Sequence, residues 1–178
     1  MKNRRALARA FPKHGVGVEV GVFRGDFSKV LLRVTKPRAL YLVDPWVHQP
    51  DTVYLDGCNR TRREFRAIYR NVKLRFARYA TVHVIKAKSL RAVRMFDDAS
   101  FDWIYIDGNH SYEAVRDDLT AWWPKLKPDG IFAGHDYIDE QPRFRVKPAV
   151  DEFALERGVL VGVTAEDRFP SWYIRKPK

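Results

Sequence analysis

Short apolar runs alternate with longer amphipathic stretches along most of the chain. The runs are rich in Val, Ile, Leu and aromatic residues, and Gly, Pro or Asp stands at most of their ends. Runs of this kind are typical of strands that are buried on both faces of a sheet. The predicted strands are residues 16–20, 40–43, 82–85, 103–106, 131–133, 160–163 and 172–174.

Four stretches between these runs have the spacing of helices. Residues 147–157, for example, have Pro148 in the first turn and Gly158 just after the last. Strands and helices that alternate in this way predict a parallel sheet covered on both faces. The segment between the last two runs is too short for a helix, so we expect these two strands to pair antiparallel. The other predicted helices are residues 26–34, 60–79 and 111–123.

The composition is typical of a single globular domain. The chain has 178 residues, of which 46% are hydrophobic and 31% charged, so one domain spanning residues 1–178 is expected. The single cysteine, Cys58, excludes an internal disulfide and indicates a reducing compartment. No apolar run approaches the roughly 18 residues needed to cross a bilayer. We therefore expect a cytoplasmic protein without a membrane span.

The turn after the first predicted strand has features of a nucleotide-binding site. Gly21 and Gly25 would let the backbone approach a ligand and turn sharply into the next helix. Asp44 ends the second strand 19 residues after Gly25, close to the spacing at which an acidic residue binds ribose hydroxyls. The alternative is that the two glycines only shape a tight turn.

The same turn favours one class of cofactor over another. It reads G-x-x-x-G rather than the dinucleotide pattern G-x-G-x-x-G, and Asp26 stands where a pyrophosphate would bind. A carboxylate at this point repels phosphate but does not repel a nucleoside that carries a positive sulfonium. S-adenosylmethionine is therefore expected as the cofactor rather than NAD.

Two histidines and two aspartates follow the fourth and fifth predicted strands. Because these strands end at the same edge of the sheet, Asp107, His110, His135 and Asp136 are expected to converge beside the cofactor turn. One task for the group is direct proton abstraction, with Asp107, His110 and His135 as catalytic residues. The other is to hold a divalent cation, Mg²⁺ or Mn²⁺, through Asp107, His135 and Asp136. The alternative is that Asp107 caps a turn and that each histidine is a hydrogen-bonded turn residue.

Four segments carry recognisable motifs: residues 19–25 (EVGVFRG), 42–46 (LVDPW), 101–112 (FDWIYIDGNHSY) and 126–137 (LKPDGIFAGHDY). In these segments the chain resembles class I S-adenosylmethionine-dependent methyltransferases, specifically a small subgroup similar to O-methyltransferases. The resemblance implies an α/β fold with one Rossmann-like, doubly wound sheet of seven strands. Their order would be 3-2-1-4-5-7-6, with the last strand antiparallel.

The resemblance also implies where the cofactor binds. Glu19 and Gly21 would lie by its methionine end, and Asp44 would hold the ribose. Trp46 would flank the adenine, and the segment that ends at Ser89 would contact the adenine edge. The expected cofactor-binding residues are Glu19, Gly21, Gly25, Asp44, Trp46, Ser89 and Asp107.

Basic residues outnumber acidic ones, and many lie on one predicted helix. The chain has 33 Lys and Arg against 22 Asp and Glu, a net charge of +11, and residues 60–78 carry eight of the basic side chains. This charge is either a solvated face or a site for an anionic partner such as RNA, an acidic glycan or a nucleotide-sugar.

Three functions are consistent with these patterns. The first is O-methylation of a hydroxyl group on a small molecule or glycan. The second is methylation of nucleic acid, at ribose or elsewhere in RNA, with the basic helix gripping phosphates. The chain has Asp107-Gly-Asn-His where base N-methyltransferases of this fold carry Asn/Asp-Pro-Pro-Tyr, which weighs against nucleobase N-methylation. The third is an S-adenosylmethionine-binding module without turnover. A homo-oligomer whose second subunit covers the site is a further open alternative.

Overall fold

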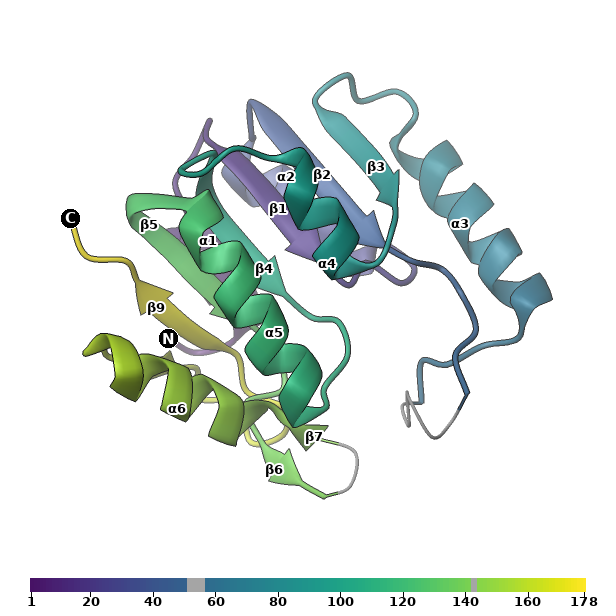
Figure 1. Cartoon of the computed structure of the whole chain (residues 1–178). Helices are drawn as coiled ribbons and strands as arrows, with labels where there is room; N and C mark the ends of the chain where they lie inside the picture. Colours follow the sequence, from purple (N-terminus) through teal and green to yellow (C-terminus); the bar gives the residue numbers. More distant parts are fainter. Residues whose placement is uncertain (51–56, 142–143) are drawn as a thin grey trace.

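A seven-stranded sheet with helices on both faces forms the centre of the computed structural model, which describes residues 1–50, 57–141 and 144–178 (Figure 1). The strand order is β3-β2-β1-β4-β5-β9-β8, in which the first five strands are parallel and β9 is antiparallel to both neighbours. The predicted order with an antiparallel strand is therefore confirmed. The bounds are β1 Val16–Val20, β2 Ala39–Asp44, β3 Val82–Lys86, β4 Phe101–Ile106, β5 Leu126–Gly134, β8 Gly162–Val163 and β9 Trp172–Arg175.

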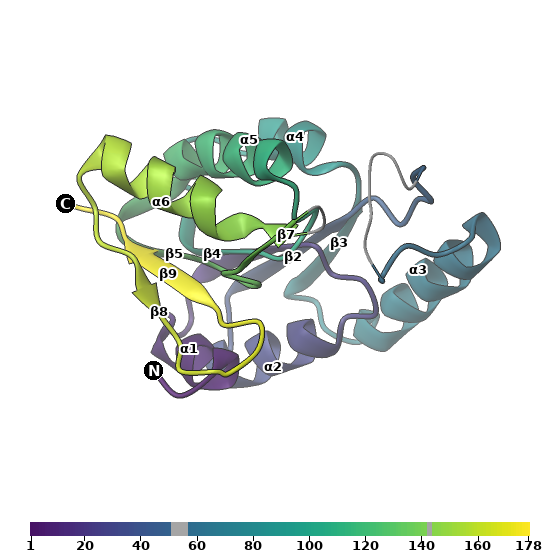
Figure 2. The same cartoon turned by 90° about the horizontal axis from the view of Figure 1, so that it is seen from below.

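The helices cover the sheet in two layers (Figure 2). Each layer has its own core, because successive strand residues point to opposite faces. In β4, Ile104 packs in the core of one face and Trp103 in the core of the other. One layer contains α4 (Ser89–Ala92), α5 (Tyr112–Trp122) and α6 (Val146–Arg157), and the other contains α1 (Arg4–Ala10), α2 (Asp26–Thr35) and α3 (Arg62–Phe76).

Three predicted elements are shorter in the structure than in the sequence analysis. The helix expected over residues 111–123 loses one residue at each end, and the other two lose more. The helix expected over residues 60–79 is α3, which begins at Arg62. Thr61 caps it by accepting from the Glu64 backbone, while the Glu64 side chain accepts from the Thr61 backbone, and this reciprocal cap fixes the start. The strand expected over residues 160–163 is reduced to the two residues of β8, at the edge of the sheet.

Several short elements were not predicted, among them α1, α4 and a hairpin of β6 (Asp139–Glu140) and β7 (Phe144–Arg145). Helix α1 has seven residues, too few for a helix that is stable by itself in water. A local cap and tertiary contacts hold it instead. Asn3 caps the helix by accepting from the Ala6 backbone, and in the tertiary structure the Arg4 backbone donates to Glu166 at 3.1 Å and Leu7 is fully buried.

Within residues 1–50, 57–141 and 144–178, none of the helices is both long and apolar enough to cross a bilayer.

Candidate active site

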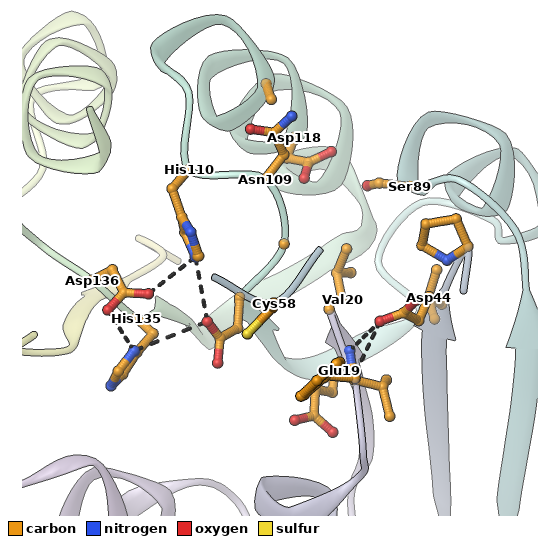
Figure 3. Close-up of a pocket in the computed structure, with 18 of the residues that line it drawn as sticks. Glu19, Val20, Asp44, Cys58, Ser89, Asn109, His110, Asp118, His135 and Asp136 are labelled. Carbon is orange, nitrogen blue, oxygen red and sulfur yellow. Dashed lines mark hydrogen bonds and ion pairs between the residues drawn. The ribbon is translucent and has the colours of Figure 1, made fainter. Parts of the chain in front are cut away.

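A pocket of about 640 Å³ opens at the carboxyl ends of β1, β2, β4 and β5 (Figure 3). This is the edge of a parallel sheet at which ligands bind in open α/β folds. The residues that directly follow these strands line the pocket, together with Arg4 from α1 and two phenylalanines, Phe144 and Phe169, from the far end of the chain.

Gly21 allows two strand ends to approach each other at the base of the pocket. Its φ is +92°, and a Cβ atom at this position would lie 1.8 Å from the carbonyl oxygen of Asp107. Gly25 has a φ of +74° and precedes α2, but it does not line the pocket. The alternative interpretation, a glycine that shapes the turn, therefore describes Gly25, whereas Gly21 lies in the pocket wall.

Asp44 fixes the turn that follows β1. Its Oδ2 accepts from the backbone of Val22 at 3.0 Å and of Phe23 at 2.9 Å, and its Oδ1 accepts from the backbone of Trp46 at 2.7 Å. Burial raises the pKa of the carboxyl group, and these three bonds oppose that effect. Asp44 lines the pocket, so one residue both orders the turn and faces the ligand space.

Trp46 does not occupy the position expected for it. Its φ is +40°, and the residue is 2% exposed, with its ring packed on Tyr69 of α3 at a centroid distance of 5.0 Å. The indole Nε1 donates to the carbonyl of Phe23 at 2.8 Å. This corrects the expectation that Trp46 flanks the adenine: Pro45 and Val47, on either side of it, line the pocket.

Glu19 is a buried carboxyl group in the pocket wall. It lies on β1, is 1% exposed and accepts a hydrogen bond from the Ser28 hydroxyl. Burial raises its pKa to about 8. The group is therefore mostly protonated at neutral pH, which relieves repulsion from the nearby carboxylate of Asp107.

The structure brings together the four residues that were expected to converge. Asp136 lies between two imidazoles: its Oδ2 is 3.0 Å from His110 Nε2, and its Oδ1 is 2.9 Å from His135 Nδ1 (Figure 3). Asp107 Oδ1 lies 3.6 Å from His110 Nε2 and 4.0 Å from His135 Nδ1. Hydrogen bonds from the two histidines hold the pKa of Asp136 well below its usual range, against the effect of burial.

The ligand set expected for a metal changes by one residue. Among the described residues, the group whose ligand atoms lie close enough to hold an ion is Asp107, His110 and Asp136, with all three atoms within 4.8 Å of one another. His135 was expected in this set and is not part of it. Its Nδ1 instead contacts Asp136 from the other side.

Sequence reasoning missed two charged residues of the pocket. Arg4 reaches in from α1: its Nη1 lies 3.7 Å from Asp107 Oδ2, and its guanidinium lies 4.0 Å from the centre of the Phe27 ring. Asp118 lies on the buried face of α5, close to Ser89. An acidic residue on the apolar stripe of the helix over residues 111–123 was a signal for Asp118, whereas nothing in the local sequence indicates where Arg4 points.

Comparisons with known proteins are consistent with this geometry. A family model described as a methyltransferase domain matches residues 18–137, more than half of the chain. A curated protein of Sinorhizobium fredii (strain NBRC 101917 / NGR234), the uncharacterized protein y4gI, is 31% identical over 70 residues. That alignment covers 39% of this chain and only 8% of the other protein, so the similarity concerns a small part of it.

Solved structures share the fold at low sequence identity. An O-methyltransferase family protein from Burkholderia thailandensis has a TM-score of 0.68 at 11% identity, covering 98% of this chain and 55% of its own. Precorrin-6y C5,15-methyltransferase from Geobacter metallireducens has a TM-score of 0.69 at 13% identity, and the match covers 97% of this chain and 87% of the other. The N-methyltransferase NodS from Bradyrhizobium japonicum has a TM-score of 0.66 at 15% identity, and the match covers 98% of this chain and 95% of the other. The printed names span different kinds of methyltransferase, so the fold alone does not define the acceptor.

Proposed function

Since the chain belongs to the methyltransferase domain family and is a class I S-adenosylmethionine-dependent methyltransferase, we propose that it methylates a hydroxyl oxygen of a small molecule or a sugar. One observation carries the choice of a hydroxyl acceptor. A carboxylate and an imidazole, Asp136 and His135, are paired at 2.9 Å in the pocket wall. This is the arrangement of a general base, and a hydroxyl group must lose a proton when its oxygen is methylated.

The charges of the pocket fit the sulfonium cofactor better than a dinucleotide. The described residues that line it include seven carboxyl groups and three Lys or Arg side chains. Glu19 is mostly protonated at neutral pH and Asp118 has a pKa of about 7, and the other five carboxyl groups still outnumber the three basic side chains. An excess of carboxylates favours a cation and repels phosphates. In this proposal Asp44 binds the ribose hydroxyls, and Glu19 and Asp107 flank the methionine part of the cofactor. When bound there, S-adenosylmethionine supplies a methyl group on a positively charged sulfur.

Asp136 sets the proton on His135. The Nδ1 nitrogen donates to Asp136 Oδ1, which leaves Nε2 as the acceptor for the proton of a substrate hydroxyl. The carboxylate then stabilises the imidazolium that forms, in the way that the aspartate of a catalytic triad does. Asp136 can do this because its pKa is held low and it stays ionised.

The remaining contribution of these residues is to hold the reacting groups in a fixed orientation. His110 holds Asp136 from the opposite side, and Arg4 approaches Asp107 at 3.7 Å. The pocket wall therefore has a fixed arrangement of donors and acceptors on the side away from Asp44. A substrate oxygen held in line with the transferred methyl group gains rate from orientation alone.

A divalent cation is the alternative way to remove the same proton. Asp107, His110 and Asp136 would hold it, and two carboxylates with one imidazole suit Mn²⁺ better than Mg²⁺. A bound cation would lower the pKa of the acceptor hydroxyl. We favour the histidine base because Asp136 is already engaged by both imidazoles.

Incubation with methyl-labelled S-adenosylmethionine and a panel of phenols, catechols and sugars tests this proposal. The expected product is a methyl ether, formed equally well with and without a chelator. Transfer to nitrogen only would contradict the hydroxyl acceptor. Loss of activity with the chelator, restored by Mn²⁺, would replace the histidine base with the cation.

A second candidate acceptor is RNA, methylated at a ribose hydroxyl. The observation that favours it is a shallow groove on α3 lined by Arg62, Arg63, Arg66, Ala67 and Arg70. Four guanidinium groups around one groove are suited to phosphates. If RNA is the acceptor, its affinity falls steeply between 50 and 200 mM salt, roughly in proportion to the number of phosphates neutralised. Flat salt dependence excludes it.

A further inference from the structure

Two phenylalanine side chains line the pocket on the side of His110. Phe144 lies on β7 and Phe169 in the segment between β8 and β9, and both are only half-buried. Their ring centroids are 5.6 Å apart, and the Phe144 ring stacks on the imidazole of His110 at 5.0 Å, with 25° between the two planes. The pocket therefore has a wall of three aromatic rings, formed by His110, Phe144 and Phe169.

This aromatic wall leads directly to the proposed base. His110 stacks on Phe144, and its Nε2 lies 3.0 Å from Asp136, which pairs through its other oxygen with His135 (Figure 3). A flat ring with a hydroxyl group at its edge can lie on the wall and point its oxygen towards the base at the same time. The wall is therefore placed to orient an aromatic acceptor.

Backbone hydrogen bonds fix both phenylalanines beside the turns that follow β4 and β5. The N–H of Arg145 donates to the His110 carbonyl at 2.8 Å, and the N–H of Tyr137 donates to the Pro170 carbonyl at 2.8 Å. Phe169 has a φ of +54°, which is uncommon for a bulky residue. Backbone strain of this kind persists where the surrounding structure holds it, and it is concentrated at ligand sites.

The two phenylalanines lie outside the part of the chain that matches the methyltransferase domain. The match covers residues 18–137, which include Asp44, His135 and Asp136. Phe144 and Phe169 come after it. The cofactor turn and the base thus belong to the matched domain, whereas the surface beside the base comes from the C-terminal segment of this chain. Selection of the acceptor can therefore reside in this segment.

We propose that Phe144 and Phe169 bind the aromatic ring of the acceptor and so select a phenol rather than a sugar; this inference rests on the proposed methylation of a hydroxyl oxygen in this pocket. Aromatic rings that pack on one another gain free energy beyond the area that they bury. Phenyl rings offer no hydrogen bonds to the hydroxyl groups of a sugar, and burying such groups without partners is unfavourable. The oxygen–methyl bond forms as the sulfur–methyl bond breaks, and the phenol proton passes to His135.

Calorimetry on the protein saturated with S-adenosylhomocysteine tests the proposal with three ligands. They are 2-naphthol, its saturated analogue decahydro-2-naphthol, and methyl β-glucopyranoside. We expect 2-naphthol to bind at least about 10-fold more tightly than either of the other two. Decahydro-2-naphthol has the same carbon skeleton and hydroxyl group but is not flat, so burial of apolar area alone would not produce this preference.

Two variants test the phenylalanines themselves. Phe144→Leu and Phe169→Leu keep an apolar side chain and remove the flat ring. Each should weaken binding of 2-naphthol about 3- to 10-fold and leave the affinities for decahydro-2-naphthol and S-adenosylhomocysteine within about 2-fold of wild type. Phe96→Leu is the matched control, since Phe96 is also half-buried but does not line the pocket, and it should keep the wild-type preference.

The outcomes separate this inference from the proposed function. If the wild-type protein binds 2-naphthol no more tightly than decahydro-2-naphthol or the glucoside, the aromatic wall is overturned and methylation of a hydroxyl group is not. The same holds if both leucine variants keep the full preference. If S-adenosylmethionine methylates only nitrogen acceptors, both proposals are overturned. The comparison of ligands on the wild-type protein needs no variant, so it remains decisive if a leucine variant fails to fold.

Discussion

The imidazole Nδ1 of His135 lies 2.9 Å from Oδ1 of Asp136, and this contact determines which ring nitrogen of His135 can accept a proton. We expect His135→Ala to lower kcat about 10²- to 10⁴-fold, the usual contribution of a general base. Asp136→Asn should lower it comparably, because an amide can hold the ring in the wrong tautomer. Steady-state kinetics together with calorimetry on S-adenosylhomocysteine provide the measurement.

The control for these variants is His83→Ala. His83 lies on β3, outside the pocket lining, and stacks on Tyr41 with ring centroids 4.9 Å apart. His83→Ala should leave kcat within about 2-fold of the wild-type value, because the substitution changes an exposed side chain outside the pocket. An unchanged kcat in His135→Ala would remove the general base from the mechanism.

Asp44 is predicted to contribute to cofactor binding in two ways, through the ribose and through the turn that it orders. Asp44→Ala leaves the backbone N–H groups of Val22, Phe23 and Trp46 without their acceptor. Affinity for S-adenosylhomocysteine should fall by about 1–3 kcal/mol. Asp129→Ala removes a surface carboxylate that pairs with Arg175 and should not change it. Equal affinity in the two variants would contradict the role of Asp44.

Glu19 makes stability depend on pH in a defined direction. Its pKa is about 8 in the folded protein, above the ordinary value of 4.5, so between these values the folded state holds a proton that the unfolded state has released. Stability therefore falls as the pH rises through this window, by up to about 1.4 kcal/mol per pH unit. Asp118 has a pKa of about 7, so below that pH it also makes the stability fall as the pH rises.

Denaturant unfolding at pH 5, 6, 7 and 8 measures this dependence. Glu19→Gln keeps the size of the side chain and cannot ionise, so its stability should fall less steeply over the range than that of wild type. The comparison isolates Glu19, because Asp118 titrates in both proteins. Parallel curves for the two proteins would show that Glu19 is not protonated in the folded state.

Gly21→Ala is expected to be severely destabilising. The new Cβ would lie 1.8 Å from the Asp107 carbonyl oxygen, and the residue must keep a φ of +92°. A backbone clash with positive φ is among the few mechanisms that cost more than about 3 kcal/mol. Gly57→Ala is the matched control, since no described residue beyond its chain neighbours has an atom within 4 Å of the added Cβ. Comparable melting temperatures for the two variants would contradict this account of the turn.

Local sequence patterns were sufficient for the sheet and for the cluster at its edge. Asp107 directly follows β4 and Asp136 lies two residues after the end of β5, so parallel pairing alone brings them to one edge. Two other positions depend on information that periodicity does not carry. The positive φ at Trp46 sends its ring into the core, and Arg4 reaches Asp107 only because distant contacts dock a seven-residue helix. Predictions from spacing succeed where topology decides the position of a side chain, and they fail where a single dihedral angle or a distant segment decides it.

The central claim is that one pocket holds the cofactor by Asp44 and presents His135 to the acceptor. A crystal structure with S-adenosylhomocysteine and Mn²⁺ tests it most directly. We predict the ribose on Asp44 and the sulfur roughly 5–6 Å from His135 Nε2, which leaves room for one methyl group and one hydroxyl oxygen. We also predict no manganese between Asp107, His110 and Asp136. S-adenosylhomocysteine bound elsewhere, or bound here with its sulfur far from His135, would contradict the account.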